Sequence, residues 1–142
     1  MEREFYKTGK IKSEVNIVND TVLVYVKEYY ESGNLESEVG MKQKQQEGLG
    51  KRYYENGTIQ EETFFANGIF DGLRKYYHPN GQLWIEQIYK KGRPWTVIAN
   101  YDNKGTKRDA GTLKDSNGTV IFYNDDGSVR EIVTYVNGER SQ

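Results

Sequence analysis

The sequence has 142 residues, of which 35% are hydrophobic, and this apolar content is too low for a deep two-layer core, so we expect a thin structure. Its 20 basic and 21 acidic residues give a net charge of −1, which excludes the basic excess that drives phosphate binding, so we expect no nucleic-acid partner. The absence of Cys excludes disulfides, thiolate metal sites and a cysteine nucleophile.

Membrane and export signals are missing from the sequence. The longest apolar runs, such as 22–26 and 96–99, are far shorter than a membrane span, and no polybasic segment indicates lipid binding. We therefore expect no membrane association. The first residues hold no apolar core of a signal peptide, so the expected location is cytoplasmic if the chain is complete and exported if a leader has been removed.

The chain repeats a unit of 24 residues, with a shorter interval of 22 before the last copy. In each copy an aromatic residue precedes a glycine by four positions. The aromatic residues are Phe5, Tyr29, Tyr53, Tyr77, Tyr101 and Tyr123, and the glycines are Gly9, Gly33, Gly57, Gly81, Gly105 and Gly127. We therefore predict a single repeat domain over 1–142 with copies at approximately 1–22, 23–46, 47–70, 71–94, 95–117 and 118–142.

Each copy predicts two short strands. After the repeat glycine, apolar residues fall on alternate positions, as at Leu35, Val39 and Met41, and a period near two indicates a strand. The segment 37–48 is the nearest to a helix-forming sequence, but the repeat predicts a strand and a turn there as well.

Two kinds of turn separate the predicted strands. The first kind lies at the repeat glycine, where Asn-Gly or Asp-Gly tolerates the positive φ of a tight hairpin, as at Asn56-Gly57, Asn80-Gly81 and Asp126-Gly127. The second kind closes most copies, at Asn67-Gly68, Lys91-Gly92, Asn117-Gly118 and Asn137-Gly138. In the first copy, Asp20 replaces the closing glycine.

The register of the hairpins has two solutions. A three-residue loop with a bulged glycine would pair Tyr53 with Ile59 and give an aromatic-to-aliphatic pair in every copy but the fifth. A two-residue loop would instead pair Lys51 with Glu62, and likewise Arg3 with Glu14, Lys27 with Glu38 and Lys75 with Glu86. We favour the first, because exposed ion pairs contribute roughly 0–1 kcal/mol whereas aromatic pairs also bury area.

Strands joined by short turns predict an all-β fold. We expect an elongated, solenoid-like antiparallel meander of about six repeated hairpins in a single twisted sheet. Charged residues at both ends would protect the edge strands from pairing with another chain; they are Glu2, Arg3, Glu4, Glu139 and Arg140. A monomer is therefore expected, with a dimer through edge pairing as the alternative.

Several copies resemble a known repeat. The segments GLRKYYHPNGQLWIEQIYKKG, GKRYYENGTIQEETFFANGIFDG and IFYNDDGSVREIVTYVNG look like MORN repeats of the second type, found in bacterial proteins often labelled YwqK-type antitoxins. The resemblance covers nearly the whole chain, although copies one, two and five depart from the pattern. It implies a MORN-like chain of hairpins in one twisted sheet and, by label, a role in neutralising a partner toxin.

Residues suited to catalysis are scarce. His78 is the only histidine, and because no motif places a nucleophile beside it we interpret it as a turn residue. The acidic residues of YDNKG and YNDDG lack the ligand spacing of a calcium loop, so they too are interpreted as turn formers. We therefore predict no enzymatic activity, no metal and no cofactor.

An aromatic patch is the candidate binding site. Trp84 and Trp95 stand where other copies carry charged or small residues, so the repeat does not require them. Together with Tyr76 they would form a binding patch, since Trp and Tyr dominate interface hot spots; the alternative is packing against a neighbouring hairpin. The hypothesis is a protein-binding module, as the antitoxin or immunity partner of a bacterial toxin. The alternative is an exported or envelope-associated protein that recognises glycan, peptidoglycan or a host surface.

Overall fold

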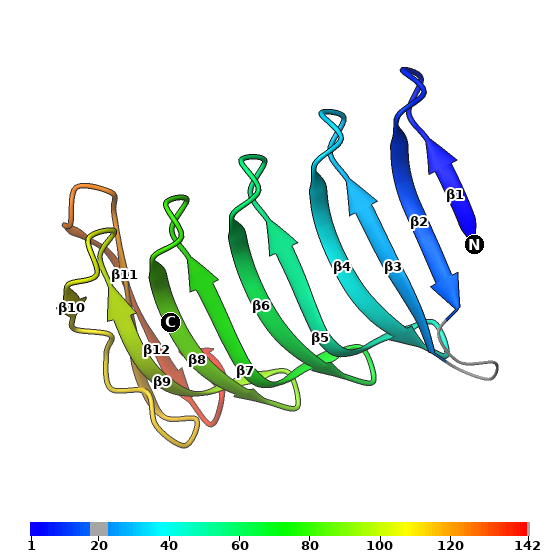
Figure 1. Cartoon of the computed structure of the whole chain (residues 1–142). Coiled ribbons are helices and arrows are strands. Elements are labelled where there is room, and N and C mark those ends of the chain that lie inside the picture. Colours follow the sequence, from blue (N-terminus) through cyan, green and yellow to red (C-terminus); the bar gives the residue numbers. More distant parts are fainter. Residues whose placement is uncertain (18–22, 142) are drawn as a thin grey trace.

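The computed structural model describes residues 1–17 and 23–141, whose regular elements are β-strands (Figure 1). In chain order they are β1 (Glu2–Phe5), β2 (Ile11–Ile17), β3 (Leu23–Tyr29), β4 (Leu35–Lys42), β5 (Gln45–Tyr53), β6 (Ile59–Ala66), β7 (Ile69–Tyr77), β8 (Leu83–Lys90), β9 (Arg93–Tyr101), β10 (Lys107–Arg108), β11 (Gly118–Tyr123), β12 (Val129–Val136) and β13 (Glu139–Ser141). The segment 37–48 belongs to β4, β5 and their turn, as the repeat predicted. Asp20 lies outside the described residues.

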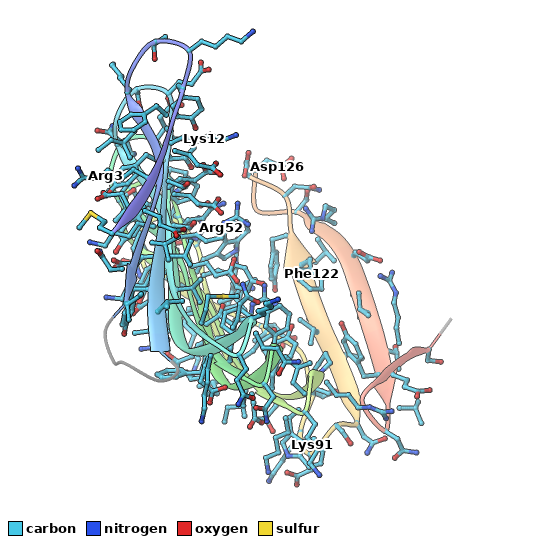
Figure 2. All side chains as sticks on the ribbon, turned by 90° about the vertical axis from the view of Figure 1, so that its right-hand side faces the viewer. Arg3, Lys12, Arg52, Lys91, Phe122 and Asp126 are labelled. Atoms are coloured by element: carbon cyan, nitrogen blue, oxygen red, sulfur yellow. The ribbon has the colours of Figure 1, made fainter. Side chains whose placement is uncertain are left out.

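Two sheets share these strands. β1 to β10 form a first antiparallel sheet in chain order, and β11 to β13 form a second sheet. The predicted all-β meander of repeated hairpins is thus confirmed. The fold differs from the predicted single sheet in its sixth copy. This copy forms the second sheet, which folds back and faces the C-terminal end of the first sheet (Figures 1 and 2).

The hairpin tips contain both of the predicted registers. Tyr53 pairs with Ile59, as we favoured, while Lys51 pairs with Glu62 in the same hairpin. Both pairings are possible because Gln60 is an extra residue between them, a β-bulge that shifts the register by one. The same combination recurs at the tips that join β1 to β2, β3 to β4 and β7 to β8.

The loop at each tip is the three-residue type. Gly57 has a φ of +91°, and its N–H donates to Tyr54 O at 2.9 Å, while Tyr54 N–H donates to Thr58 O at 2.8 Å. A glycine in the left-handed region closes this loop. The repeat glycine is therefore required by the backbone of the turn.

The turns at the other end of the hairpins have two residues with positive φ. Asn67 and Gly68 have φ of 52° and 82°, values typical of a type I′ turn. Lys91-Gly92 and Asn137-Gly138 form the same turn. The turn predicted at Asn117-Gly118 is wrong by two residues: it lies at Asp115 and Ser116, and Asn117 N–H closes it by donating to Lys114 O at 3.1 Å.

Tyrosine side chains connect each hairpin with both neighbours. The Tyr53 hydroxyl donates to Glu38 Oε1 of the preceding copy at 2.9 Å, and the Tyr54 hydroxyl donates to Tyr77 O of the next copy at 2.6 Å. Equivalent bonds run from Tyr29 to Glu14, from Tyr77 to Glu62, from Tyr6 to Tyr29 O and from Tyr30 to Tyr53 O. The paired aromatic residues of the repeat therefore hold successive copies together.

Residues 109–117 lead the chain from the first sheet to the second. Val97 N–H donates to Leu113 O at 3.0 Å on one side, and Leu113 N–H donates to Thr119 O at 2.9 Å on the other. Gly111 has a φ of +101°, and a Cβ there would lie 2.2 Å from Thr119 O, so only glycine fits. The buried hydrophobic residues gather around this corner and are Ile85, Ala99, Leu113, Val120, Ile121 and Val133.

Candidate functional site

The first sheet has an inner face, which we define as the side that faces the second sheet. Figure 2 shows Arg52 and Phe122 on the facing sides of the two sheets, and Arg3 on the opposite side. Arg52 pairs with Glu61, and Glu61 pairs with Tyr76, so these side chains share the inner face. The opposite side, which we call the outer face, carries the alternate residues of the same strands.

Arg74 is the centre of a cluster on the inner face. Its guanidinium carbon lies 4.0 Å from the ring centroid of Phe70, 4.9 Å from that of Tyr76 and 5.4 Å from that of Tyr89. Arg74 Nη2 also lies 2.7 Å from Glu61 Oε1, and both side chains are only 15% exposed. Arginine is thus fixed by aromatic rings and by a carboxylate, which makes the cluster a rigid surface.

A hollow of about 420 Å³ adjoins the Arg74 cluster on the inner face. Val39, Gly50, Arg52 and Phe65 line it together with Phe70, and a Cβ added at Gly50 would be 2.9 Å from the Phe65 ring. The candidate residue Tyr76 belongs to the Arg74 cluster; burial raises the pKa of its hydroxyl, and the charge of Arg74 opposes that shift.

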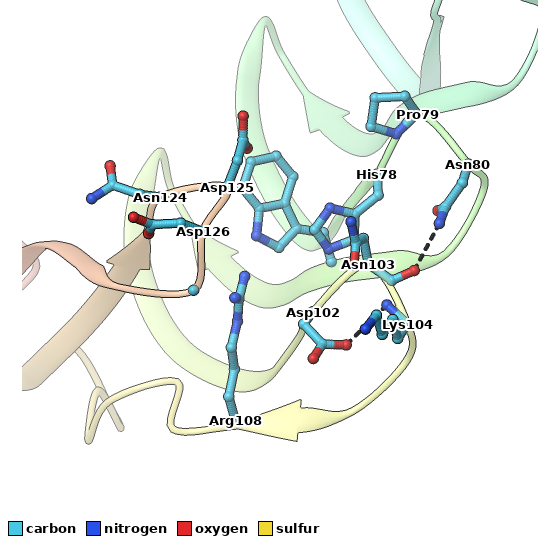
Figure 3. Close-up of a pocket in the computed structure, with 12 residues that line it drawn as sticks. His78, Pro79, Asn80, Asp102, Asn103, Lys104, Arg108, Asn124, Asp125 and Asp126 are labelled. Atoms are coloured by element: carbon cyan, nitrogen blue, oxygen red, sulfur yellow. Dashed lines mark hydrogen bonds between the residues drawn. The ribbon is translucent and has the colours of Figure 1, made fainter.

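A second concavity, the tip cleft, lies where three turns meet. Its volume is about 580 Å³, and its walls come from the turns at 78–80, 102–104 and 124–127 together with Trp84 and Arg108 (Figure 3). The third turn joins β11 to β12, so the cleft has a wall from each sheet. It exists because the sixth copy folds back over the first sheet.

Trp84 lies in the wall of the tip cleft. It is the bulge residue of its hairpin, since Leu83 pairs with Tyr77 and Ile85 pairs with Tyr76. Its ring stacks on His78 with centroids 4.7 Å apart and an interplanar angle of 18°. Its Nε1 is enclosed and has no hydrogen-bond partner among the described residues, a situation that costs about 1–3 kcal/mol.

Charged groups of both signs surround the tip cleft. Backbone hydrogen bonds from Thr106 and Lys104 lower the pKa of Asp102, and hydrogen bonds from the Ser128 hydroxyl and N–H lower that of Asp126. Both are therefore carboxylates near neutral pH. Figure 3 shows Arg108 extending into the cleft between the turns of these two aspartates, and its Nε donates to Asn100 Oδ1 at 2.7 Å.

Within residues 1–17 and 23–141, no group of three or more His, Cys, Asp or Glu side chains is placed to hold a metal ion. The acidic turns YDNKG and YNDDG meet at the tip cleft, where the carboxylates of Asp102 and Asp126 accept hydrogen bonds from the backbone of their own turns. Their role as turn formers, as interpreted from the sequence, agrees with these bonds.

Trp95 lies apart from the other two aromatic candidates. Lys90 Nζ is 4.6 Å from its ring centroid, and it lines a separate hollow of about 790 Å³ with Ile88 and Arg93. Trp84, Tyr76 and Trp95 therefore occupy three different places, the tip cleft, the Arg74 cluster and this hollow, and the structure does not bring them into one patch.

The repeat positions have structural roles. The six repeat glycines have φ between 86° and 97°. A hydrogen bond to Glu14 is the main cause that raises the pKa of Tyr29 to about 12, whereas burial is the main cause for Tyr53 and Tyr77, which reach the same value. His78 Nε2 lies 2.9 Å from Tyr101 O and so fills the place that a tyrosine hydroxyl takes in earlier copies.

The two arginines of these sites, Arg74 and Arg108, were not among the sequence candidates. Arg74 stands where neighbouring copies have Val26, Gly50 and Ile98, so its departure from the repeat was a usable signal. Arg108 occupies the same repeat position as Trp84, one copy later. Both residues line the tip cleft because adjacent copies place this position side by side.

Comparisons with known proteins agree with the repeat. No curated protein matches the chain. The sequence pattern of the MORN repeat variant matches more than half of it, in five segments at residues 1–19, 25–43, 46–67, 70–91 and 116–137. The unmatched segment 92–115 contains most of the fifth copy, which departs from the repeat and leads into the corner between the sheets.

The family is a non-catalytic repeat module of the kind that binds proteins or membranes. In the described part of the chain, no helix is long and apolar enough to cross a membrane. The hairpin repeat, its turn glycines and the five matched segments lead to one assignment. The chain belongs to the MORN repeat variant family.

Proposed function

We propose that the chain is a protein-binding module whose inner face receives the partner. The observation that carries this proposal is the Arg74 cluster, in which an arginine lies over Phe70, Tyr76 and Tyr89 beside a hollow. Arginine and aromatic residues dominate interface hot spots. Because these side chains are held before binding, little conformational entropy is lost when a partner docks.

The outer face is a weaker candidate. Its strands pair Lys51 with Glu62 and Lys75 with Glu86, whose charged atoms are 3.9 Å apart in the second pair. Such partly exposed pairs keep contact with water and contribute little to binding. The inner face instead combines rings, one held arginine and a hollow, which favours it as the binding surface.

The finer proposal is that the partner is a toxin and that the chain is its antitoxin or immunity protein. Its support is the resemblance of copies three, four and six to YwqK-type antitoxins, together with a broad open face that suits covering a toxin's surface. A cytoplasmic location is proposed with it. We also propose a monomer, since the edge strand β1 is exposed along its length and carries Glu2, Arg3 and Glu4.

The test uses two adjacent residues on opposite faces. Arg52 is exposed on the inner face, and Lys51 next to it is on the outer face. The chain and its Arg52→Ala, Phe70→Ala variant should differ in a pull-down from lysate of the source organism, with one stoichiometric protein lost in the variant. The Lys51→Ala control should retain it. Equal retention by all three would contradict the inner-face proposal.

The antitoxin proposal needs a separate measurement. The captured protein is expressed alone and together with the chain. Growth arrest by the partner alone, relieved by the chain but not by its Arg52→Ala, Phe70→Ala variant, is the expected result. A captured protein that does not affect growth would refute the antitoxin role while leaving the protein-binding function in place.

A further inference from the structure

The tip cleft has a chemistry of its own, separate from the inner-face cluster. We propose that it binds a neutral saccharide, as a short oligosaccharide or as the end of a larger glycan. The site uses Trp84, His78, Arg108 and the turn at 124–127, and does not involve Arg74 or the hollow beside it. It therefore goes beyond the proposed protein-binding function and can be tested independently.

The size and origin of the cleft are those of a ligand site. Its volume of about 580 Å³ lies within the range of roughly 300–1,000 Å³ that is typical of small-molecule sites. Three turns from two sheets converge on it, and sites at such junctions are common. The turns at 78–80 and 102–104 are fixed to each other, because Asn80 Nδ2 donates to Asn103 O at 2.7 Å (Figure 3).

The cleft offers an aromatic wall. Trp84 and His78 stack one over the other with an interplanar angle of 18°, so the pair holds an aromatic surface in the wall of the cleft. The repeat does not call for this arrangement, since the Trp84 position holds Lys12, Glu36 or Gln60 in earlier copies. The C–H face of a pyranose ring packs on such a surface through dispersion and apolar contact.

The polar groups of the cleft supply both donors and acceptors. Arg108 is a donor only, whereas the carboxylates of Asp125 and Asp126 are acceptors only. A hydroxyl group can bond to either kind, so a polyol satisfies both sets at once. The carboxylates of Asp102, Asp125 and Asp126 would repel an anion. Arg108 and Lys104 would repel a cation. A neutral polyhydroxylated ligand fits this balance better than a charged one.

Nuclear magnetic resonance of the full chain tests the proposal directly. The chain has two tryptophans and one histidine, so the indole N–H signals of Trp84 and Trp95 and the ring signals of His78 are few and assignable. The protein is titrated with chitobiose, cellobiose, maltose and lactose, and in parallel with inorganic phosphate and trimethyllysine. Saturable shifts of the Trp84 and His78 signals with at least one disaccharide are expected, while the Trp95 signal stays in place.

Variants identify the groups that bind. Trp84→Phe replaces the indole of the wall by a smaller ring, and Asp125→Ala removes an exposed acceptor; each should weaken the affinity for the responsive disaccharide about tenfold or more. Trp95→Phe and the inner-face variant Arg52→Ala should leave it unchanged. The proposal is overturned if the Trp84 signal moves with none of the disaccharides, if only phosphate or trimethyllysine moves it, or if Trp95→Phe weakens binding equally.

Discussion

Tyr29, Tyr53 and Tyr77 hold their hydroxyl protons tightly. The main cause is the hydrogen bond to Glu14 for Tyr29 and burial for Tyr53 and Tyr77, whose hydrogen bonds to a glutamate of the preceding copy add to it. Their pKa is raised from 10.0 to about 12. In the unfolded chain they ionise near pH 10, so their contribution to stability is complete below pH 10 and is lost as the pH rises towards 12. We predict that the free energy of unfolding falls across this window.

Urea denaturation at a series of alkaline pH values measures this fall, and ultraviolet absorbance of tyrosinate in the folded protein reports the delayed ionisation. Replacement of the three tyrosines by Phe should flatten the dependence in the same window, since a phenylalanine has no proton to lose. A slope that is unchanged in the triple variant would assign the alkaline loss of stability to other groups.

A substitution of Gly57 tests the predicted turn, because a new side chain there would clash with no neighbouring atom. The φ of Gly57 is +91°, and a Cβ added there would meet nothing within 4 Å, so a side chain is opposed by the backbone alone. Gly57→Val should therefore lower the free energy of unfolding by about 1–3 kcal/mol. Glu55→Val, in the same loop but without a positive φ, is the matched control. A melting temperature unchanged in Gly57→Val would refute the turn assignment.

At the scale of elements, we predict that one partly buried ion pair stabilises the pairing of β6 with β7 more than an exposed pair stabilises that of β1 with β2. Arg74 and Glu61 are each 15% exposed, whereas Arg3 and Glu14, 3.1 Å apart, are 46% and 12% exposed. Double-mutant cycles with Ala should give a coupling of about 1–2 kcal/mol for the first pair and less than about 1 kcal/mol for the second. Equal couplings would show that burial on the inner face does not strengthen the pair.

The hairpins could be predicted because each depends on residues within one copy. Alternating apolar residues give the strands, and the bulge at Gln60 is the reason that both proposed pairings, of Tyr53 and of Lys51, occur together. The fold-back of the sixth copy could not be predicted in this way. It depends on contacts across the corner, such as Gly111 against Thr119, whose only trace in the sequence is the irregular fifth copy.

The candidate sites could likewise be predicted only where the signal lies within one copy. Trp84 and Arg74 depart from the repeat, and this departure is visible in the sequence. The remaining walls of the tip cleft come from turns whose Asp and Asn residues are equally typical of any hairpin. Only the fold brings Asp102 and Asp126 to the same cleft, so composition and spacing could not distinguish them from turn formers.

The molecule as a whole is a linear array with its core at one end. Every buried hydrophobic residue among those described lies between Ile85 and Val133, whereas β1 is exposed along its whole length. In an array whose copies touch mainly their neighbours, stability is a sum of local terms, so it should rise from the N-terminal hairpin to the corner between the sheets.

Amide hydrogen exchange tests this gradient, with slow exchange expected in β8, β9, β11 and β12 and fast exchange in β1 and β2. Adjacent residues of β12 give a matched pair, since Val133 is 3% exposed and Ile132 is 57% exposed. Val133→Ala should cost about 2 kcal/mol and accelerate exchange only around the corner, because distant copies make no contact with it, whereas Ile132→Ala should change little. If Val133→Ala accelerated exchange equally in β1 and β2, the array would instead unfold as one cooperative unit.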